Sequence, residues 1–203
     1  MSLSRLVLVR HGETVGQSSV RYYGATDVAL SDSGRAQMAR VRAGLVGECF
    51  DAVYTSKLQR TLAAARIIVP DLPPRPVAGF NEINFGDWEG LTREEIEARD
   101  PDGARRWRTA FAEFTYPGGD AVLQFRSRVV GAFRVLLPEM PERALIVAHK
   151  GVIASIVEEL LRLSPAERAA WPIDLASIHI LAAADGAWHA EAVNTCAHLE
   201  RLA

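Results

Sequence analysis

An arginine and a histidine lie side by side where an apolar segment of the chain ends. The segment Leu6–Val9 is short and rich in branched side chains, which is typical of a buried strand, and Arg10 and His11 follow it directly. A neutral imidazole can attack phosphorus, and a guanidinium presents a planar set of donors that fits a phosphoryl group. The pair therefore indicates phosphoryl chemistry, although an Arg-His pair taken alone is more often a surface charge beside a hydrogen-bonded loop histidine.

A second apolar segment also ends at a histidine. Residues 144–148 form this segment, and His149 follows at once. In open α/β sheets, ligands bind at the carboxyl edge of the strands. Two parallel strands that end at His11 and His149 would place both imidazoles at that edge, around one phosphoryl group. The alternative for His149 is a core residue whose ring is satisfied by the backbone.

Several segments resemble the histidine phosphatase superfamily, also called the phosphoglycerate mutase-like superfamily. The heptapeptide LVRHGET at 8–14 is similar to the family's opening, and further similarities follow in the family's order as far as Leu199. They lie at 27–37 (D-x-x-L-T/S-x-x-G-x-x-Q), 53–61 (V-Y-S/T-S-x-L-x-R-T), 80–91 (L-x-E-x-x-F-G-x-W-E-G), 144–153 (V-x-H-G-G-V-I) and 193–199 (N-x-x-x-H-L). The resemblance covers nearly the whole chain.

The resemblance implies separate roles for the histidines and arginines of the site. His11, neutral on its attacking nitrogen, would take the phosphoryl group and become a phosphohistidine. Arg10, Arg60 and a protonated His149 would hold the phosphoryl oxygens, since a phosphate dianion removed from water needs more than one cation. Without the resemblance, Arg60 would be interpreted as a solvated arginine in the first turn of a helix. Neither a metal nor a cofactor is implied.

The resemblance assigns the proton of the leaving group to Glu82. An alkoxide leaves slowly unless it is protonated, and apolar neighbours such as Phe80 and Phe85 could raise the pKa of this carboxyl group by desolvation. In the second half of the reaction the same carboxylate would take a proton from the attacking water. The competing acids in this stretch, Asp87 and Glu89, are expected to be loop or structural residues.

Two positions depart from the family pattern near the expected site. Many members carry an asparagine that touches the phosphoryl group a few residues beyond the first histidine, and here Gln17 could substitute with its amide. Lys150 stands directly after His149, where glycine is usual. It could face a second anionic group of the substrate, or it could point to solvent, as long lysine side chains usually do.

The residues expected to border the leaving group are Arg21, Tyr22, Tyr23 and Gly24. They occupy the loop that borders the substrate in similar enzymes. An arginine and two tyrosines would suit an anionic or ring-bearing leaving group. The expected partner is therefore a small phosphorylated substrate.

The composition is that of a compact protein and excludes several function classes. The chain has 203 residues, 49% of them hydrophobic and 24% charged, and a net charge of -2 that argues against nucleic-acid binding. No apolar run reaches the ~18 residues of a membrane span and no signal peptide is recognisable, so we expect a cytoplasmic protein. The histidines lack zinc-ligand spacing, and Cys49 and Cys196 are expected to be free thiols.

Strand and helix segments alternate along the chain. Strands are expected at 4–10, 51–54, 75–79, 144–148, 177–182 and 188–193, and helices at 32–47, 57–69, 92–99, 102–113, 120–137 and 151–162. This order predicts an α/β fold, a three-layer α/β/α sandwich with a mostly parallel sheet and an antiparallel edge, which is phosphoglycerate mutase-like. We expect a single domain over 1–203 with a helical insertion at about 80–119, which could form a wall of the pocket or merely pack its own aromatic side chains.

Three functions are compatible with these residues. The first is a metal-independent phosphomonoesterase, favoured because the chain is short and lacks the longer insert and tail by which similar mutases shield phosphohistidine from water. The second is a cofactor-dependent phosphoglycerate mutase. The third is a non-catalytic module that binds a phosphoryl ligand or a protein. The joint presence of His11, Arg10, Arg60, Glu82 and His149 argues against it, since a mere binder has no need of Glu82. A homodimer would be in keeping with similar enzymes, whereas nucleic-acid and membrane partners are not expected.

Overall fold

The computed structural model describes residues 3–200 of the chain. In that range the strands form one six-stranded sheet in the order β3-β2-β4-β1-β5-β6. The strands are β1 (Arg5–Arg10), β2 (Ala52–Thr55), β3 (Arg75–Pro76), β4 (Arg143–Ala148), β5 (Ile178–Ala184) and β6 (Ala187–Thr195). The first four run parallel, β5 pairs antiparallel with β1, and β6 pairs antiparallel with β5. The predicted α/β fold with a mostly parallel sheet and an antiparallel edge is confirmed.

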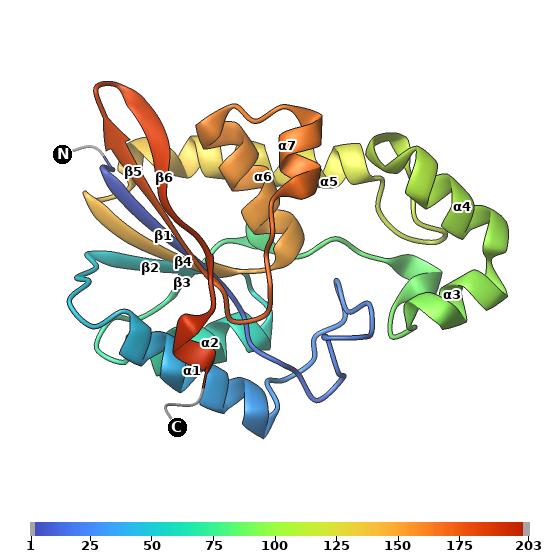
Figure 1. The fold of residues 1–203 in the computed structure, drawn as a ribbon, viewed down its shortest axis with the longest axis horizontal. Coiled ribbons are helices and arrows are strands. Elements are labelled where there is room, and N and C mark those ends of the chain that lie inside the picture. The colour runs from blue at the N-terminus through green and yellow to red at the C-terminus, as the bar shows by residue number, and fades with distance from the viewer. Residues whose placement is uncertain (1–2, 201–203) are drawn as a thin grey trace.

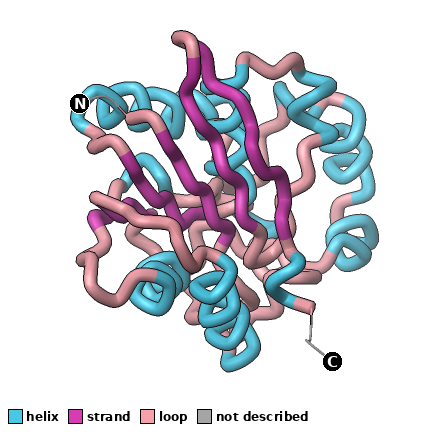
Figure 2. Tube along the Cα trace, turned by 60° about the vertical axis from the view of Figure 1, so that its left-hand side comes forward, coloured by secondary structure: helices cyan, strands magenta, loops and turns pink. Residues whose placement is uncertain are grey.

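Helices cover both faces of the sheet. They are α1 (Asp32–Gly44), α2 (Gln59–Ile68), α3 (Arg93–Arg99), α4 (Pro101–Thr109), α5 (Val122–Leu136), α6 (Lys150–Leu161) and α7 (Pro165–Ala170). In Figure 1, α1 and α2 lie below the sheet, whereas α5, α6 and α7 lie above it. Figure 2 shows the strands side by side, with helices on either side of them. These are the three layers of an α/β/α sandwich.

The core follows the alternation of side chains along β1. Leu6 and Leu8 point to one face and pack in the cluster that holds the apolar stripes of α5 and α6. Val7 and Val9 point to the opposite face and pack with α1 and α2. Because all four side chains are fully buried, β1 is a central strand covered on both faces.

The segment between Phe80 and Gly119 departs from the strand-helix alternation. Helices α3 and α4 lie at one end of the molecule, beyond the sheet (Figure 1). Its aromatic side chains pack on one another: the ring centroids of Trp88 and Phe114 are 5.3 Å apart, and those of Trp88 and Tyr116 are 5.4 Å apart. An aromatic cluster of this kind gives the segment its own apolar support.

Three secondary-structure expectations were wrong in part. The strand expected at 75–79 is limited to Arg75–Pro76, and a 3₁₀ helix occupies 78–80, because the prolines at 73, 74 and 76 cannot donate to a strand ladder. The helix expected at 102–113 ends at Thr109. Helix α7 was not expected, although the capping box of Ser164 and Glu167 at its start is visible in the sequence.

Two further observations concern the described part of the chain. Cys49 and Cys196 are free thiols, as expected. Between residues 3 and 200, none of the helices combines the length and the apolar character that a membrane crossing requires.

Candidate active site

His11 and His149 meet because β1 and β4 end at the same level. Arg10 is paired with Ala148 in the parallel register, and the backbone N–H of His11 donates to the carbonyl of Ala148 at 3.0 Å. The centroids of the two imidazoles are 5.1 Å apart, and the rings are inclined at 67°. Both side chains are buried, with 4% of His11 and 1% of His149 exposed. The structure therefore places the two histidines together at the carboxyl edge of the sheet.

The hydrogen bond of His11 assigns its tautomer. Its Nδ1 lies 2.7 Å from the carbonyl oxygen of Gly12, which can only accept, so we assign the proton to Nδ1. Burial, and then the charges of Arg60 and Arg10, lower the pKa of His11 well below its usual value. The ring is consequently neutral at pH 7, with an unprotonated Nε2 that can act as a nucleophile.

His149 is also neutral, which corrects the expectation that it is protonated. The Nε–H of Arg60 donates to His149 Nδ1 at 3.3 Å, so this nitrogen carries no proton. The Nε2–H then donates to Ser56 Oγ at 2.8 Å. Burial, followed by the charge of Arg60, lowers the pKa of His149 well below its usual value. His149 can therefore offer one N–H donor to an anion, but no positive charge of its own.

Arg60 is fully buried and is held by backbone carbonyl groups. It lies in the first turn of α2, and its exposed fraction is 0%. Its Nη1 donates to the carbonyl of Thr26 at 2.8 Å, and its Nη2 to the carbonyl of Gly24 at 2.6 Å. Burial lowers its pKa, but a guanidinium is so strong a base that it stays charged.

Arg10 is also held by a backbone carbonyl group. Its Nη1 donates to the carbonyl of Ile173 at 2.9 Å, while its Nε is buried without a hydrogen-bond partner. The loop that supplies this carbonyl is fixed by Asn194, which accepts from the backbone N–H of Asp174 at 2.8 Å and donates to its carboxylate at 2.7 Å. Within residues 3–200, neither Arg10 nor Arg60 forms an ion pair with a carboxylate. Their charge is therefore available to an anionic ligand.

Glu82 is a buried acid beside this cationic group. Its exposed fraction is 7%, and its carboxylate accepts from the backbone N–H groups of Ile83 and Gly151, both at 3.0 Å. Burial raises its pKa above the usual value, against the opposing effect of these two hydrogen bonds. A Cβ at position 151 would lie 2.6 Å from Glu82 Oε1, so the absence of a side chain there lets the carboxylate reach its place.

The arrangement combines a neutral nucleophile, two guanidiniums and an acid with a raised pKa. It can bind a dianion, attack it and protonate a departing group. Within the residues that the structure describes, no group of three or more histidine, cysteine or acidic side chains could hold a metal ion.

Gln17 and Lys150 have no side-chain hydrogen bond within the described residues, and both are exposed. Gln17 has a φ of 63°, and its backbone closes the turn that follows Thr14. Lys150 is the first residue of α6, directly after His149. Desolvation, and then the charge of Arg10, lower the pKa of Lys150.

Arg21 and Tyr22 are already engaged within the protein. Arg21 forms an ion pair with Glu95 at 2.8 Å and donates to the carbonyl of Gly90 at 2.7 Å. The ring of Tyr22 packs edge-on against Phe85, with ring centroids 5.3 Å apart. The guanidinium of Arg21 would have to exchange these bonds to meet a substrate.

Tyr23 and Gly24 shape the loop rather than extend from it. The ring of Tyr23 fills the space where a Cβ on Gly16 would lie, at 2.4 Å. Gly24 offers its carbonyl to Arg60, and its N–H donates to Glu89 at 3.1 Å. Glu89 and Ser56 are polar residues close to the site that sequence reasoning did not assign to it, although both lie inside segments that resemble the family.

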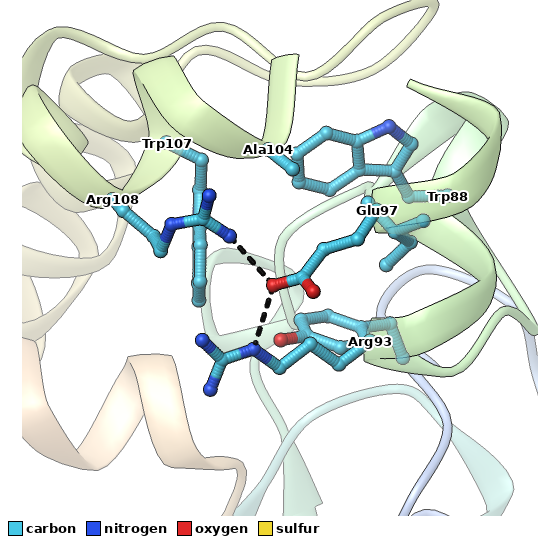
Figure 3. Close-up of a pocket in the computed structure, with 8 residues that line it drawn as sticks. Trp88, Arg93, Glu97, Ala104, Trp107 and Arg108 are labelled. Carbon is cyan, nitrogen blue, oxygen red and sulfur yellow. Dashed lines mark hydrogen bonds and ion pairs between the residues drawn. The ribbon is translucent and has the colours of Figure 1, made fainter. Parts of the chain in front are cut away.

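The small pocket shown in Figure 3 lies mainly in the 80–119 segment, and neither His11 nor His149 lines it. Its lining residues are Tyr22, Trp88, Arg93, Ile96, Glu97, Ala104, Trp107 and Arg108. In its lining, Glu97 pairs with Arg93 at 3.1 Å and with Arg108 at 2.6 Å. None of the candidate catalytic residues lines this pocket.

A known protein family matches most of the chain. The family description "Histidine phosphatase superfamily (branch 1)" matches residues 6–195. The chain therefore belongs to the histidine phosphatase superfamily, branch 1.

Relatives of the chain include both phosphatases and mutases. It is 31% identical over 167 residues to the adenosylcobalamin/alpha-ribazole phosphatase of Escherichia coli, and the aligned region covers 80% of this chain and 81% of the relative. It is also 31% identical over 172 residues to the 2,3-bisphosphoglycerate-dependent phosphoglycerate mutase 2 of Gloeobacter violaceus, and the aligned region covers 80% of this chain and 78% of that mutase. Among solved structures, a mycobacterial glucosyl-3-phosphoglycerate phosphatase in complex with VO3 is similar, with a TM-score of 0.84 at 28% identity over 95% of this chain and 100% of that chain.

Proposed function

We propose that the protein is a phosphomonoesterase that hydrolyses a small phosphorylated metabolite through a phosphohistidine on His11. One observation carries the proposal: a neutral His11 with an unprotonated Nε2 lies in the field of two guanidiniums, Arg10 and Arg60, that have no carboxylate partner among the described residues. Uncompensated positive charge in a buried site attracts a dianionic phosphoryl group and holds it against the nucleophile.

In the first half-reaction, His11 Nε2 attacks phosphorus, and the bond from phosphorus to the leaving oxygen breaks. Arg10 and Arg60 hold the phosphoryl oxygens, and the Nε2–H of His149 turns from Ser56 to a further oxygen. The two guanidiniums are already fixed by backbone carbonyl groups, so they stabilise the charge of the transition state without reorganisation. The steps use side chains of this chain only, without a metal ion.

Glu82 moves the proton in both half-reactions. Its raised pKa supports a protonated acid, which gives its proton to the departing oxygen as the alcohol leaves. The resulting carboxylate then takes a proton from water. That water attacks the phosphorus, the bond between phosphorus and His11 Nε2 breaks, and inorganic phosphate is released with the histidine neutral again.

The substrate would lie between the histidines and the exposed side chains at the rim. We propose that Gln17 and Lys150 contact it, Lys150 through a second anionic group. The loop that contains Arg21, Tyr22, Tyr23 and Gly24 would border it mainly through its shape, because three of these four residues already have partners in the protein.

A phosphoglycerate mutase is the second candidate. The mutase of Gloeobacter violaceus is as similar to this chain as the phosphatase of Escherichia coli, at 31% identity each. In a mutase, the phosphoryl group returns from His11 to a phosphoglycerate instead of passing to water.

The products distinguish the two functions. The purified protein is incubated with a panel of phosphorylated metabolites, including 3-phosphoglycerate with and without a 2,3-bisphosphoglycerate primer. We expect release of inorganic phosphate that is lost in the His11→Asn variant. Conversion of 3-phosphoglycerate to 2-phosphoglycerate would identify a mutase, and binding of phosphate without turnover on any ester would identify a binding module.

A further inference from the structure

Glu89 is bound to a loop on the far side of Arg60. Its Oε1 accepts from the backbone N–H groups of Phe85 and Ala25, both at 3.0 Å. Its Oε2 accepts from the N–H of Thr26 at 3.3 Å, and both oxygens lie 3.1 Å from the N–H of Gly24. One carboxylate thus binds three consecutive amides of the loop 24–26 and ties them to the start of the 80–119 segment.

The carbonyl groups of the same loop bind Arg60. Gly24 and Thr26 accept from its Nη2 and Nη1, and its Nε binds His149. The loop is therefore a connector: its N–H groups are directed at Glu89 and its carbonyls at the guanidinium. Each of the three nitrogens of the Arg60 guanidinium has in this way one bonded partner, and each Nη keeps a second N–H for a ligand.

The N–H groups of the connector have no acceptor other than Glu89 among the described residues. Residues 24–26 form neither helix nor strand, so their N–H groups have no ladder to enter; Gly24 is buried, whereas Ala25 and Thr26 are exposed. The buried amide of Gly24 would be costly to leave without an acceptor. The contact with the 80–119 segment is also close, because a Cβ on Gly24 would lie 1.8 Å from the carbonyl oxygen of Ile83. Glu89 supplies the acceptors that fix this part of the chain.

The indirect link preserves the charge of the site. A carboxylate bonded directly to Arg60 would neutralise the guanidinium that should bind the phosphoryl group. Here the loop 24–26 separates the Glu89 carboxylate from Arg60. The guanidinium of Arg60 is therefore oriented by neutral carbonyl groups and keeps its charge for the ligand.

We propose that Glu89 is a positioning residue that aims the guanidinium of Arg60 through the loop 24–26. This inference rests on the proposed phosphoryl-transfer function and assigns a role to an acid that the reaction itself does not use. Its loss should act on the transition state more than on substrate binding, because a displaced guanidinium no longer matches the developing charge.

The test uses the full chain and p-nitrophenyl phosphate, whose leaving group needs no proton. We expect Glu89→Ala to lower kcat by about 10- to 100-fold with less than a threefold change in KM. Glu89→Gln, which keeps one acceptor oxygen, should show a smaller loss. Asp87→Ala is the matched control, because Asp87 lies two residues away and has no side-chain hydrogen bond among the described residues; its kcat should stay within twofold of the wild type.

A double-mutant cycle shows whether Glu89 acts through Arg60. In an Arg60→Ala background the further change Glu89→Ala should lower kcat by less than threefold, since there is no longer a guanidinium to aim. Equal losses in both backgrounds, or an equal loss in Asp87→Ala, would overturn the positioning role. If Glu89→Ala does not fold, as thermal unfolding would show, the same cycle with Glu89→Gln decides.

The failure of this inference can be distinguished from the failure of the proposed function. A wild-type protein that releases no phosphate from any ester would contradict the function. A wild-type protein that turns over normally, with Glu89→Ala and Glu89→Gln unchanged in kcat, would contradict the role of Glu89 alone.

Discussion

Replacing Gly151 with alanine is expected to displace the proton donor while leaving the nucleophile in place. The added Cβ would lie 2.6 Å from Glu82 Oε1 and 2.9 Å from Cε1 of Phe125. The carboxylate must therefore move by about 0.8 Å to reach the 3.4 Å of an ordinary contact. His11 does not contact Gly151 through any hydrogen bond in the described chain, so its attack should be affected much less.

The size of the effect follows from the displacement. A misplacement of about 1 Å can lower a rate ~100-fold, and a general acid contributes about 10²- to 10⁴-fold. We expect kcat/KM for an alkyl ester such as glycerol 3-phosphate to fall by about 30- to 100-fold in Gly151→Ala. For p-nitrophenyl phosphate, whose leaving group needs no proton, the fall should be less than about threefold. Overpacking should also lower the free energy of unfolding by about 1–3 kcal/mol.

The assay compares the two esters side by side in steady-state kinetics. Gly131→Ala is the control, because Gly131 lies in α5 and no heavy atom lies within 4 Å of its added Cβ. This variant should keep wild-type kinetics and gain about 0.5–1 kcal/mol of stability from the better helix former. Equal losses on both esters in folded Gly151→Ala, or no loss on the alkyl ester, would refute the reasoning about Glu82.

Two further predictions concern stability and specificity. The free energy of unfolding should decrease as the pH falls below about 6.5, because burial and nearby charge lower the pKa of His11 and His149 in the folded protein, so the unfolded chain takes up protons first. Urea titrations at a series of pH values should show a slope of up to about 1.4 kcal/mol per pH unit for each histidine. A free energy of unfolding that does not change with pH would count against neutral, buried rings. Lys150→Ala should lower kcat/KM about 10-fold for 3-phosphoglycerate and less than about threefold for glycerol 3-phosphate, since only the first ester carries a carboxylate. The control is Lys57→Ala, a change at the other lysine of the chain. Equal losses on both esters in Lys150→Ala would contradict a role for Lys150 in binding a second anion.

The meeting of the two histidines could be predicted from local sequence. Each follows an apolar segment of strand length, and parallel strands end at one edge of a sheet, so His11 and His149 had to come close if both segments were neighbours. The resemblance to a family added Arg60 and Glu82, whose positions depend on contacts across many residues and have no local pattern. The strand predicted at 75–79 was wrong in part for a local reason, since proline removes the donors that a strand needs.

The protonation of His149 and the role of Glu89 could not be predicted in this way. The neutral state of His149 depends on a bond from Arg60, which lies 89 residues away in the sequence. Glu89 accepts from the N–H of Gly24 across 65 residues, and Arg21 is bonded to Glu95, 74 residues distant. Such contacts follow from how the loops pack, which neither periodicity nor the type of a single residue reveals.

The most direct test of the account is a rapid, acid-free quench of the protein during turnover of a phosphomonoester labelled in its phosphoryl group. The account predicts an acid-labile label on His11 that forms and decays within the turnover time, appears in inorganic phosphate, and is absent in His11→Asn. A label found on another residue, or turnover that persists in His11→Asn, would contradict the claim that His11 is the nucleophile.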